Sequence, residues 1–104
     1  MDLEAFWELA ESGTIVLSRH ADEMRMNREI SFKDIHSALR GLDVIEFYPD
    51  AYPHPALLIF GHMDSVPIHV VAGFDFIASM VYIITVYFPD EKHFEPNLRM
   101  RRPT

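Results

Sequence analysis

The first part of the chain repeats apolar residues with the period of a helix. Across residues 2–11, glutamates alternate with a stripe of large apolar side chains, and the Ser-Gly pair that follows stops the pattern. The stripe consists of Leu3, Phe6, Trp7 and Ala10. This spacing predicts an amphipathic helix, followed at 14–18 by a short β-branched segment in an extended conformation.

Two further helical segments are expected before residue 42. The stretch that begins at residue 18 or 19 is rich in helix-forming side chains. Ser31 followed by Asp34 resembles an acidic variant of the capping box that opens a helix, and Gly41 is suited to close that helix. The helical part of the chain is therefore predicted to span residues 1–41.

After Gly41 the period changes from helical to extended. Four β-branched and aromatic runs are separated by short links, and short links favour antiparallel neighbours. The runs are DVIEFYP at 43–49, ALLIFGH at 56–62, VPIHVVAG at 66–73 and SMVYIITVYFP at 79–89. Residues 42–90 are thus predicted to form a four-stranded antiparallel meander with the helices on one face, an α+β domain. The basic tail at 91–104 is expected to be loosely ordered.

The alternation of side chains assigns residues of the last two predicted strands to faces. In the third strand Ile68, Val70 and Ala72 share one face and His69 lies on the other. In the fourth strand the wholly apolar set, Tyr82, Ile84, Val86 and Phe88, is expected to face the helices, opposite Ile83, Thr85 and Tyr87. If odd positions pair with odd positions, His69, Thr85 and Tyr87 lie together on the more polar face.

Length and composition restrict the class of protein. A chain of 104 residues with 49% hydrophobic residues can bury one core, so 1–104 is expected to be a single domain. No apolar run is long enough to cross a bilayer, and the acidic N-terminus does not resemble a signal peptide. The absence of cysteine excludes disulfides and thiolate chemistry. A cytoplasmic location is therefore expected.

Charge is distributed unevenly along the chain. The formal net charge is −7, which argues against nonspecific nucleic-acid binding, and residues 41–91 contain seven acidic residues and no Lys or Arg. Any site for a polyanion must therefore use basic residues from the two segments outside that range. These residues are Arg19, Arg25, Arg28, Lys33 and Arg40, and in the tail Arg99, Arg101 and Arg102.

Three groups of residues are candidates for chemistry. The strand face with His69, Thr85 and Tyr87 could perform acid–base work, although a strand histidine beside hydroxyl groups is also an ordinary hydrogen-bonded residue. His20, two helical turns from Arg28, could protonate a phosphate oxygen that the guanidinium binds, or could be a plain helix residue. His54, His62, Asp64 and His69 could ligate zinc or nickel, but their spacing follows no ligand motif, so no metal site is predicted.

Seven short motifs in order resemble the bacterial family catalogued as domain of unknown function 4258. They are SRHA at 18–21, Arg28 with IS at 30–31, EFYPD at 46–50, PALLIFG at 55–61, PIHVV at 67–71, IITVYFPD at 83–90 and RMRR at 99–102. The resemblance implies a barnase or RelE-like ribonuclease fold and a metal-independent, RNA-cleaving toxin whose partner is a small zinc-ribbon antitoxin. It also implies a catalytic site at His20, Arg28, His69, Thr85 and Tyr87.

The leading hypothesis from the sequence is therefore a small ribonuclease. RNA would bind near Arg25, Arg28 and the arginines of the tail, and His20 and His69 would serve as the acid–base pair. The alternative is a noncatalytic interaction module or an inactive homologue. In that case the apolar link that contains Phe74, Phe76 and Ile77 would form a homodimer or partner surface.

Overall fold

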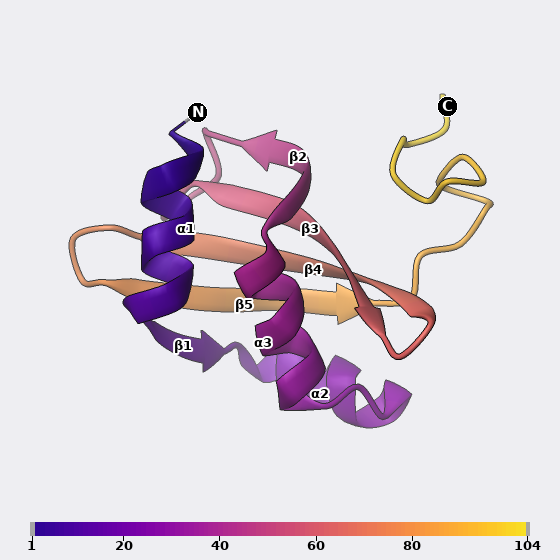
Figure 1. Cartoon of the computed structure of the whole chain (residues 1–104), viewed down its shortest axis with the longest axis horizontal. Coiled ribbons are helices and arrows are strands. Elements are labelled where there is room, and N and C mark those ends of the chain that lie inside the picture. The colour runs from indigo at the N-terminus through magenta and orange to yellow at the C-terminus, as the bar shows by residue number, and fades with distance from the viewer. Residues whose placement is uncertain (1, 104) are drawn as a thin grey trace.

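Three helices and five strands make up the part of the chain that the computed structural model describes, residues 2–103 (Figure 1). The helices are α1 (Leu3–Ser12), α2 (Arg19–Arg28) and α3 (Phe32–Gly41). The strands are β1 (Thr14–Leu17), β2 (Asp43–Tyr48), β3 (Ala56–Met63), β4 (Val66–Asp75) and β5 (Met80–Tyr87). The predicted α+β class is confirmed.

Each helix begins at a side chain that caps it. The carboxylate of Asp2 accepts a hydrogen bond from the backbone of Ala5, and the Ser18 hydroxyl accepts one from Ala21. The Ser31 hydroxyl accepts one from the backbone N–H of Asp34 at 3.1 Å, as the sequence predicted. These contacts satisfy backbone donors that the first turn of a helix leaves without partners.

The sheet contains one strand more than the sequence predicted. Its order is β1-β5-β4-β3-β2, and β2 to β5 form the expected antiparallel meander. The expectation of a wholly antiparallel, four-stranded sheet is wrong, because β1 pairs with β5 in parallel at the edge. The extended segment after α1 was recognised, but its partner lies more than sixty residues away, and local pattern does not specify such a pairing.

A β-bulge in β5 changes which side chains face the helices. Val71 pairs with Thr85 and Ala72 pairs with Ile83, so Ile84 is an extra residue without a partner in β4. Ile83 is therefore fully buried in the core, whereas Ile84 is 42% exposed on the opposite face. The prediction that Tyr82 and Ile84 face the helices and that Ile83 faces away from them is wrong for this reason. The odd-with-odd pairing holds on the other side of the bulge, where His69 lies opposite Tyr87.

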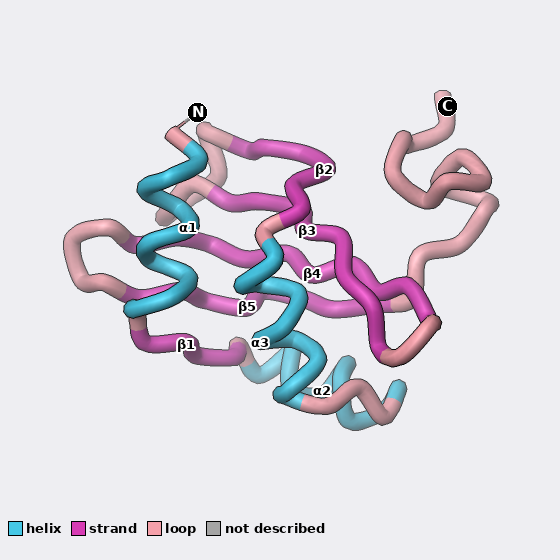
Figure 2. Tube along the Cα trace, in the orientation of Figure 1, coloured by secondary structure: helices cyan, strands magenta, loops and turns pink. Residues whose placement is uncertain are grey.

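The main core lies between the sheet and the helices. Helices α1 and α3 cross the same face of the sheet (Figure 2). The buried side chains beneath them include Phe6, Ile35, Leu39, Ile68 and Val70. β1 pairs only with the first half of β5, and α2 contacts β5 beyond the end of β1. In this way a helix covers the part of an edge strand that would otherwise be left unpaired.

The C-terminal tail folds back onto the sheet rather than remaining loosely ordered. Phe94 is 2% exposed and forms a backbone bridge with Arg101. Arg99 makes two hydrogen bonds of 2.6 Å to the carboxylate of Asp43 at the start of β2. Tail residues thus cover part of the face of the sheet that α1 and α3 leave open, at the position of His69.

The apolar link between β4 and β5 is only partly exposed. Phe74 is completely buried, and Phe76, at 44% exposure, packs edge to face on Phe6 with 5.0 Å between ring centroids. Ile77 alone of the three is fully exposed. The expectation that Phe74 forms part of a dimer surface is therefore wrong, because its ring fills the chain's own core. A homodimer through the rest of this link stays a prediction.

Close packing between α3 and β3 depends on Gly61. A Cβ atom at this position would lie 2.3 Å from Cβ of Ala38, so the Gly61→Ala substitution requires the helix to move. We expect a loss of about 1–3 kcal/mol in the free energy of unfolding, measured by urea denaturation. Gly41→Ala is the matched control, because a Cβ there meets nothing within 4 Å and should stabilise the helix by up to about 1 kcal/mol. Equal stabilities of the two variants would contradict this account of the packing.

Candidate functional site

A polar cleft of about 310 Å³ lies where α2, the end of β5 and the tail meet. It is lined by Arg28, Tyr87, Phe88, Asp90, His93, Phe94 and Arg101. Arg28 comes from the last turn of α2 and Tyr87 from the last residue of β5, while the other residues follow β5. Three separate parts of the chain therefore bring two arginines, an imidazole, a phenol and a carboxylate to one place.

The imidazole of His93 is oriented by Asp90. The two residues lie in a turn directly after β5, where Oδ1 of Asp90 also accepts the backbone N–H groups of Lys92 and His93. Nδ1 of His93 lies 2.8 Å from the same oxygen. These contacts hold the pKa of Asp90 below its ordinary value, with the His93 side-chain bond as the largest cause. Because an ionised carboxylate only accepts, Nδ1 carries the proton, and Nε2 is the atom left for a substrate.

Helix α2 aligns His20, Met24 and Arg28 along one side at intervals of four residues. Nε2 of His20 lies 3.1 Å from the hydroxyl of Thr85 in β5. Arg28 donates a hydrogen bond of 3.2 Å to the sulfur of Met24 and lines the cleft. Thr85 and Tyr87 are two residues apart on one strand face, so backbone geometry separates them by about 7 Å. His20 is thus held beside the cleft, one strand step away from Tyr87.

His69 is fully buried beneath the tail, and both of its ring nitrogens have partners inside the protein. Nε2 lies 2.7 Å from the carbonyl oxygen of Leu98, and Nδ1 lies 3.2 Å from the hydroxyl of Tyr87. A carbonyl only accepts, so Nε2 carries the proton and the hydroxyl of Tyr87 donates to Nδ1. In this conformation His69 presents no nitrogen to a substrate. Its role as an acid or base stays a prediction that requires the tail to move.

The surroundings of His69 favour the neutral imidazole. Phe94 approaches the ring edge to face, with 4.6 Å between centroids, and Phe60 and Tyr87 pack on it as well. Burial among these rings lowers the pKa of His69, and the bond to Leu98 opposes that shift only in part. Burial also raises the pKa of Tyr87, so its phenol keeps the proton that it donates. His69 therefore fastens the tail to the sheet as a neutral residue.

Carboxylates of β2 and of the tail neutralise the tail arginines. Arg99 pairs with Asp43 at 2.6 Å, Arg101 with Glu46 at 3.1 Å, and Arg102 with Glu95 at 3.2 Å. The Arg101 guanidinium is the main reason that the pKa of Glu46 falls below its ordinary value. Glu46 accepts from Tyr48 as well, and burial together with this contact raises the pKa of Tyr48 to about 12. A phosphate at these arginines must compete with carboxylates that are already in place.

The remaining predicted binding residue, Arg25, faces a different part of the surface. Its guanidinium pairs with Asp22 at 2.9 Å and lies 4.3 Å from the centroid of the Phe32 ring. It does not line the cleft. Of the predicted residues, the structure therefore brings Arg28, Tyr87 and Arg101 to the cleft wall. It places His20 and Thr85 beside the cleft and His69 beneath it. The remaining three, Arg25, Arg99 and Arg102, do not line the cleft.

Two of the remaining histidines pack against aromatic rings. His54 stacks on Tyr82, while His62 approaches Phe60. Within residues 2–103, no three His, Asp or Glu side chains are grouped so that they could hold a metal ion. No helix in the same range is long and apolar enough to span a membrane.

Sequence reasoning did not identify His93 and Asp90 as site residues. The signal that could have found them is the sequence Pro-Asp-x-x-His directly after the last predicted strand. An Asp side chain at the start of a turn often accepts backbone hydrogen bonds from the residues that follow, which would hold the histidine three positions later close to the carboxylate. The pattern is short, and only the folded tail shows that it faces Arg28.

One family model matches the chain, and it covers residues 17–88, from the end of β1 through β5. Its description is "Domain of unknown function (DUF4258)". No curated protein and no solved structure was found to match. The matched range contains α2, α3 and the four antiparallel strands, and therefore Arg28 and Tyr87 of the cleft. Because the match covers more than half of the 104-residue chain, the protein belongs to the DUF4258 family.

Proposed function

We propose that the protein is a small ribonuclease that cleaves RNA at the cleft between α2, the end of β5 and the tail. The observation that carries the proposal is that His93, oriented by Asp90 at 2.8 Å, shares the lining of one cavity with Arg28. An oriented imidazole beside a guanidinium suits proton transfer at a phosphodiester, where negative charge develops. The mechanism requires no metal ion.

The proposed reaction is an internal transesterification of RNA. Nε2 of His93 removes the proton of the ribose 2′-hydroxyl, and the 2′-oxygen attacks the adjacent phosphorus. Arg28 stabilises the additional negative charge on the phosphoryl oxygens. The bond from phosphorus to the 5′-oxygen then breaks, and that oxygen takes a proton from His20. The products are a 2′,3′-cyclic phosphate and a 5′-hydroxyl end.

His93 replaces His69 in this mechanism for a geometric reason. A general base must reach its proton through a hydrogen bond of about 2.6–3.2 Å, and both nitrogens of His69 already make such bonds inside the protein. His93 is exposed, and no second partner of its ring is found among residues 2–103. Its Nε2 is therefore accessible to a ribose.

The biological setting that we propose follows from the family resemblance. A barnase or RelE-like fold is consistent with helices that precede an antiparallel meander. As a toxin of bacterial cytoplasm, the protein would be paired with a small zinc-ribbon antitoxin. Co-expression tests this part on its own, because growth arrest caused by the protein should be relieved by the product of a neighbouring zinc-ribbon gene.

Cleavage of a single-stranded RNA with a fluorophore and a quencher tests the proposed activity. We expect Arg28→Ala to lower the cleavage rate by about 10-fold. This is less than the 100- to 1000-fold seen in closed oxyanion holes, because the cleft is open to water. Arg19→Ala is the matched control, since Arg19 lies on the same helix, its side chain is 94% exposed, and within residues 2–103 its one ion pair is with Glu23. Wild-type protein that leaves RNA intact in the presence of EDTA would overturn the proposal and favour a noncatalytic interaction module.

A further inference from the structure

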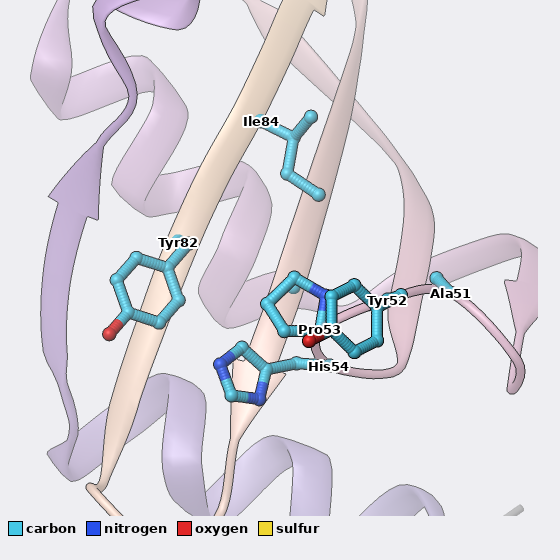
Figure 3. Close-up of a pocket in the computed structure, with 7 residues that line it drawn as sticks. Ala51, Tyr52, Pro53, His54, Tyr82 and Ile84 are labelled. Atoms are coloured by element: carbon cyan, nitrogen blue, oxygen red, sulfur yellow. The ribbon is translucent and has the colours of Figure 1, made fainter.

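A second cavity, of about 350 Å³, lies on the sheet face that α1 and α3 leave uncovered (Figure 3). It is separate from the cleft and shares no residue with it. Its lining is Ala51, Tyr52, Pro53, His54, Gly73, Tyr82 and Ile84. The link between β2 and β3 forms one wall, and Gly73 of β4 together with Tyr82 and Ile84 of β5 forms the rest.

The walls of this cavity present flat aromatic rings. His54 and Tyr82 stack with 5.6 Å between ring centroids and an interplanar angle of 7°. Tyr52 is 96% exposed, and Ile84 reaches the cavity because of the bulge in β5. Gly73 has no side chain to fill the space beneath Ile84. The cavity therefore offers the faces of aromatic rings, which carry partial negative charge.

Apart from histidine, the charged residues in the segment that lines the cavity are all acidic. Residues 41–91, which supply its whole lining, contain no Lys or Arg. Asp50 immediately precedes the lining residues, and Asp75 lies 3.5 Å from Nε2 of His54. Ring faces and carboxylates both attract a cation, whereas the phosphates of a nucleic acid would be repelled. The cavity therefore favours a cationic ligand, whereas the cleft lined by Arg28 and Arg101 favours an anionic one.

We infer that this cavity binds the guanidinium or ammonium side chain of an arginine or lysine in a partner protein. The apolar stem of such a side chain would pack on Pro53 and Ile84, and its charged end would lie over the rings of Tyr52 and Tyr82. The chain's own tail arginines do not fill this role, because Arg99, Arg101 and Arg102 form ion pairs with Asp43, Glu46 and Glu95. The inference is independent of the proposed ribonuclease activity.

A charged ligand and its neutral isostere test the inference. N-acetyl-arginine amide and N-acetyl-citrulline amide have nearly the same shape, but only the first is charged. In titrations followed by NMR, we expect the arginine derivative to shift the signals of Tyr52, Tyr82 and Ile84 and to bind about 2- to 5-fold more tightly than citrulline, the ratio that an exposed cation–π contact gives. N-acetyl-lysine amide should shift the same signals.

Two variants of Tyr82 distinguish the contribution of its aromatic ring from that of its apolar volume. Tyr82→Phe keeps the ring and should keep the preference for arginine over citrulline, whereas Tyr82→Leu keeps an apolar side chain and should lose it. The hydroxyl of Tyr82 bonds only to the sulfur of Met80 within residues 2–103, so its removal should be tolerated. Tyr52→Ala, at an exposed position, is a second variant that should fold normally. Equal binding of citrulline, no binding of either compound, or tighter binding of uridine monophosphate would each overturn the inference.

Discussion

RNA cleavage is expected to slow by about 100-fold or more when His93 is replaced by alanine, because a positioned general base contributes at least that factor. The thermal midpoint should change little, since the side chain is exposed and contacts only Asp90 among the hydrogen-bond partners in residues 2–103. The measurement is single-turnover cleavage of a short RNA together with thermal unfolding of the same preparation. A 2′-deoxy substitution at the cleaved nucleotide should abolish the reaction in the wild type.

Three further variants test the proposed roles of His93, Asp90 and His20. Asp90→Asn should lower the rate less than His93→Ala, because it leaves the base in place but no longer fixes the proton on Nδ1 of His93. His62→Ala is the matched histidine control, since it is exposed and does not line the cleft. His20→Ala should slow cleavage if it protonates the leaving oxygen. Full activity of His93→Ala would refute its assignment and direct attention back to His69 in a tail-open state.

Replacement of His69 by alanine is expected to lower the free energy of unfolding by about 3 kcal/mol and to release the tail. The substitution removes a fully buried ring that contacts Phe94 and leaves the Tyr87 hydroxyl and the Leu98 carbonyl without partners. Lost packing and unsatisfied polar groups both contribute to a cost of this size. Urea denaturation measures the first effect. Limited trypsin digestion measures the second, because cleavage after Arg99 and Arg101 should become faster, whereas the bond after Arg102 precedes Pro103 and resists trypsin.

Burial of His69 also makes the stability of the folded protein depend on pH in a direction that can be predicted. The pKa of His69 is lower in the folded state than in the unfolded chain, so the unfolded state binds more protons in the window between the two values. Stability from this group is complete above the unfolded value near 6.5 and is lost as the pH falls below it. Asp43 and Glu46 act in the same direction, since arginines lower their pKa values and their contribution is lost at still lower pH.

A substitution of His69 that cannot titrate distinguishes the contribution of the histidine to the pH dependence of stability from that of Asp43 and Glu46. His69→Gln retains one donor and one acceptor but does not change charge, so stability just below pH 6.5 should depend less on pH than in the wild type. The loss that Asp43 and Glu46 cause below that range should persist. If the tail arginines are digested at the same rate in the wild type and His69→Ala, His69 does not fasten the tail.

The elements of this fold could be predicted because each depends on residues that are close together in sequence. Helix starts were visible at Ser18 and Ser31, whose hydroxyls bond to backbone groups three positions later. The four strands of the meander were visible because period-2 patterns and short links restrict neighbouring segments to antiparallel pairs. The same alternation placed His69 and Tyr87 on one face on the condition that odd positions pair with odd positions, and the structure meets that condition at these two residues.

Only the tertiary structure decided the features that depend on distant contacts or on a single inserted residue. The parallel pairing of β1 with β5 and the bulge at Ile84 change no local pattern, yet they set the fifth strand and the face on which Tyr82 lies. The tail decided the candidate site, because it buries His69 beneath Phe94 and brings His93 into a cleft with Arg28. Such contacts join residues as far apart in sequence as Thr14 and Met80, and their free energy depends on burial and geometry that a linear pattern does not contain.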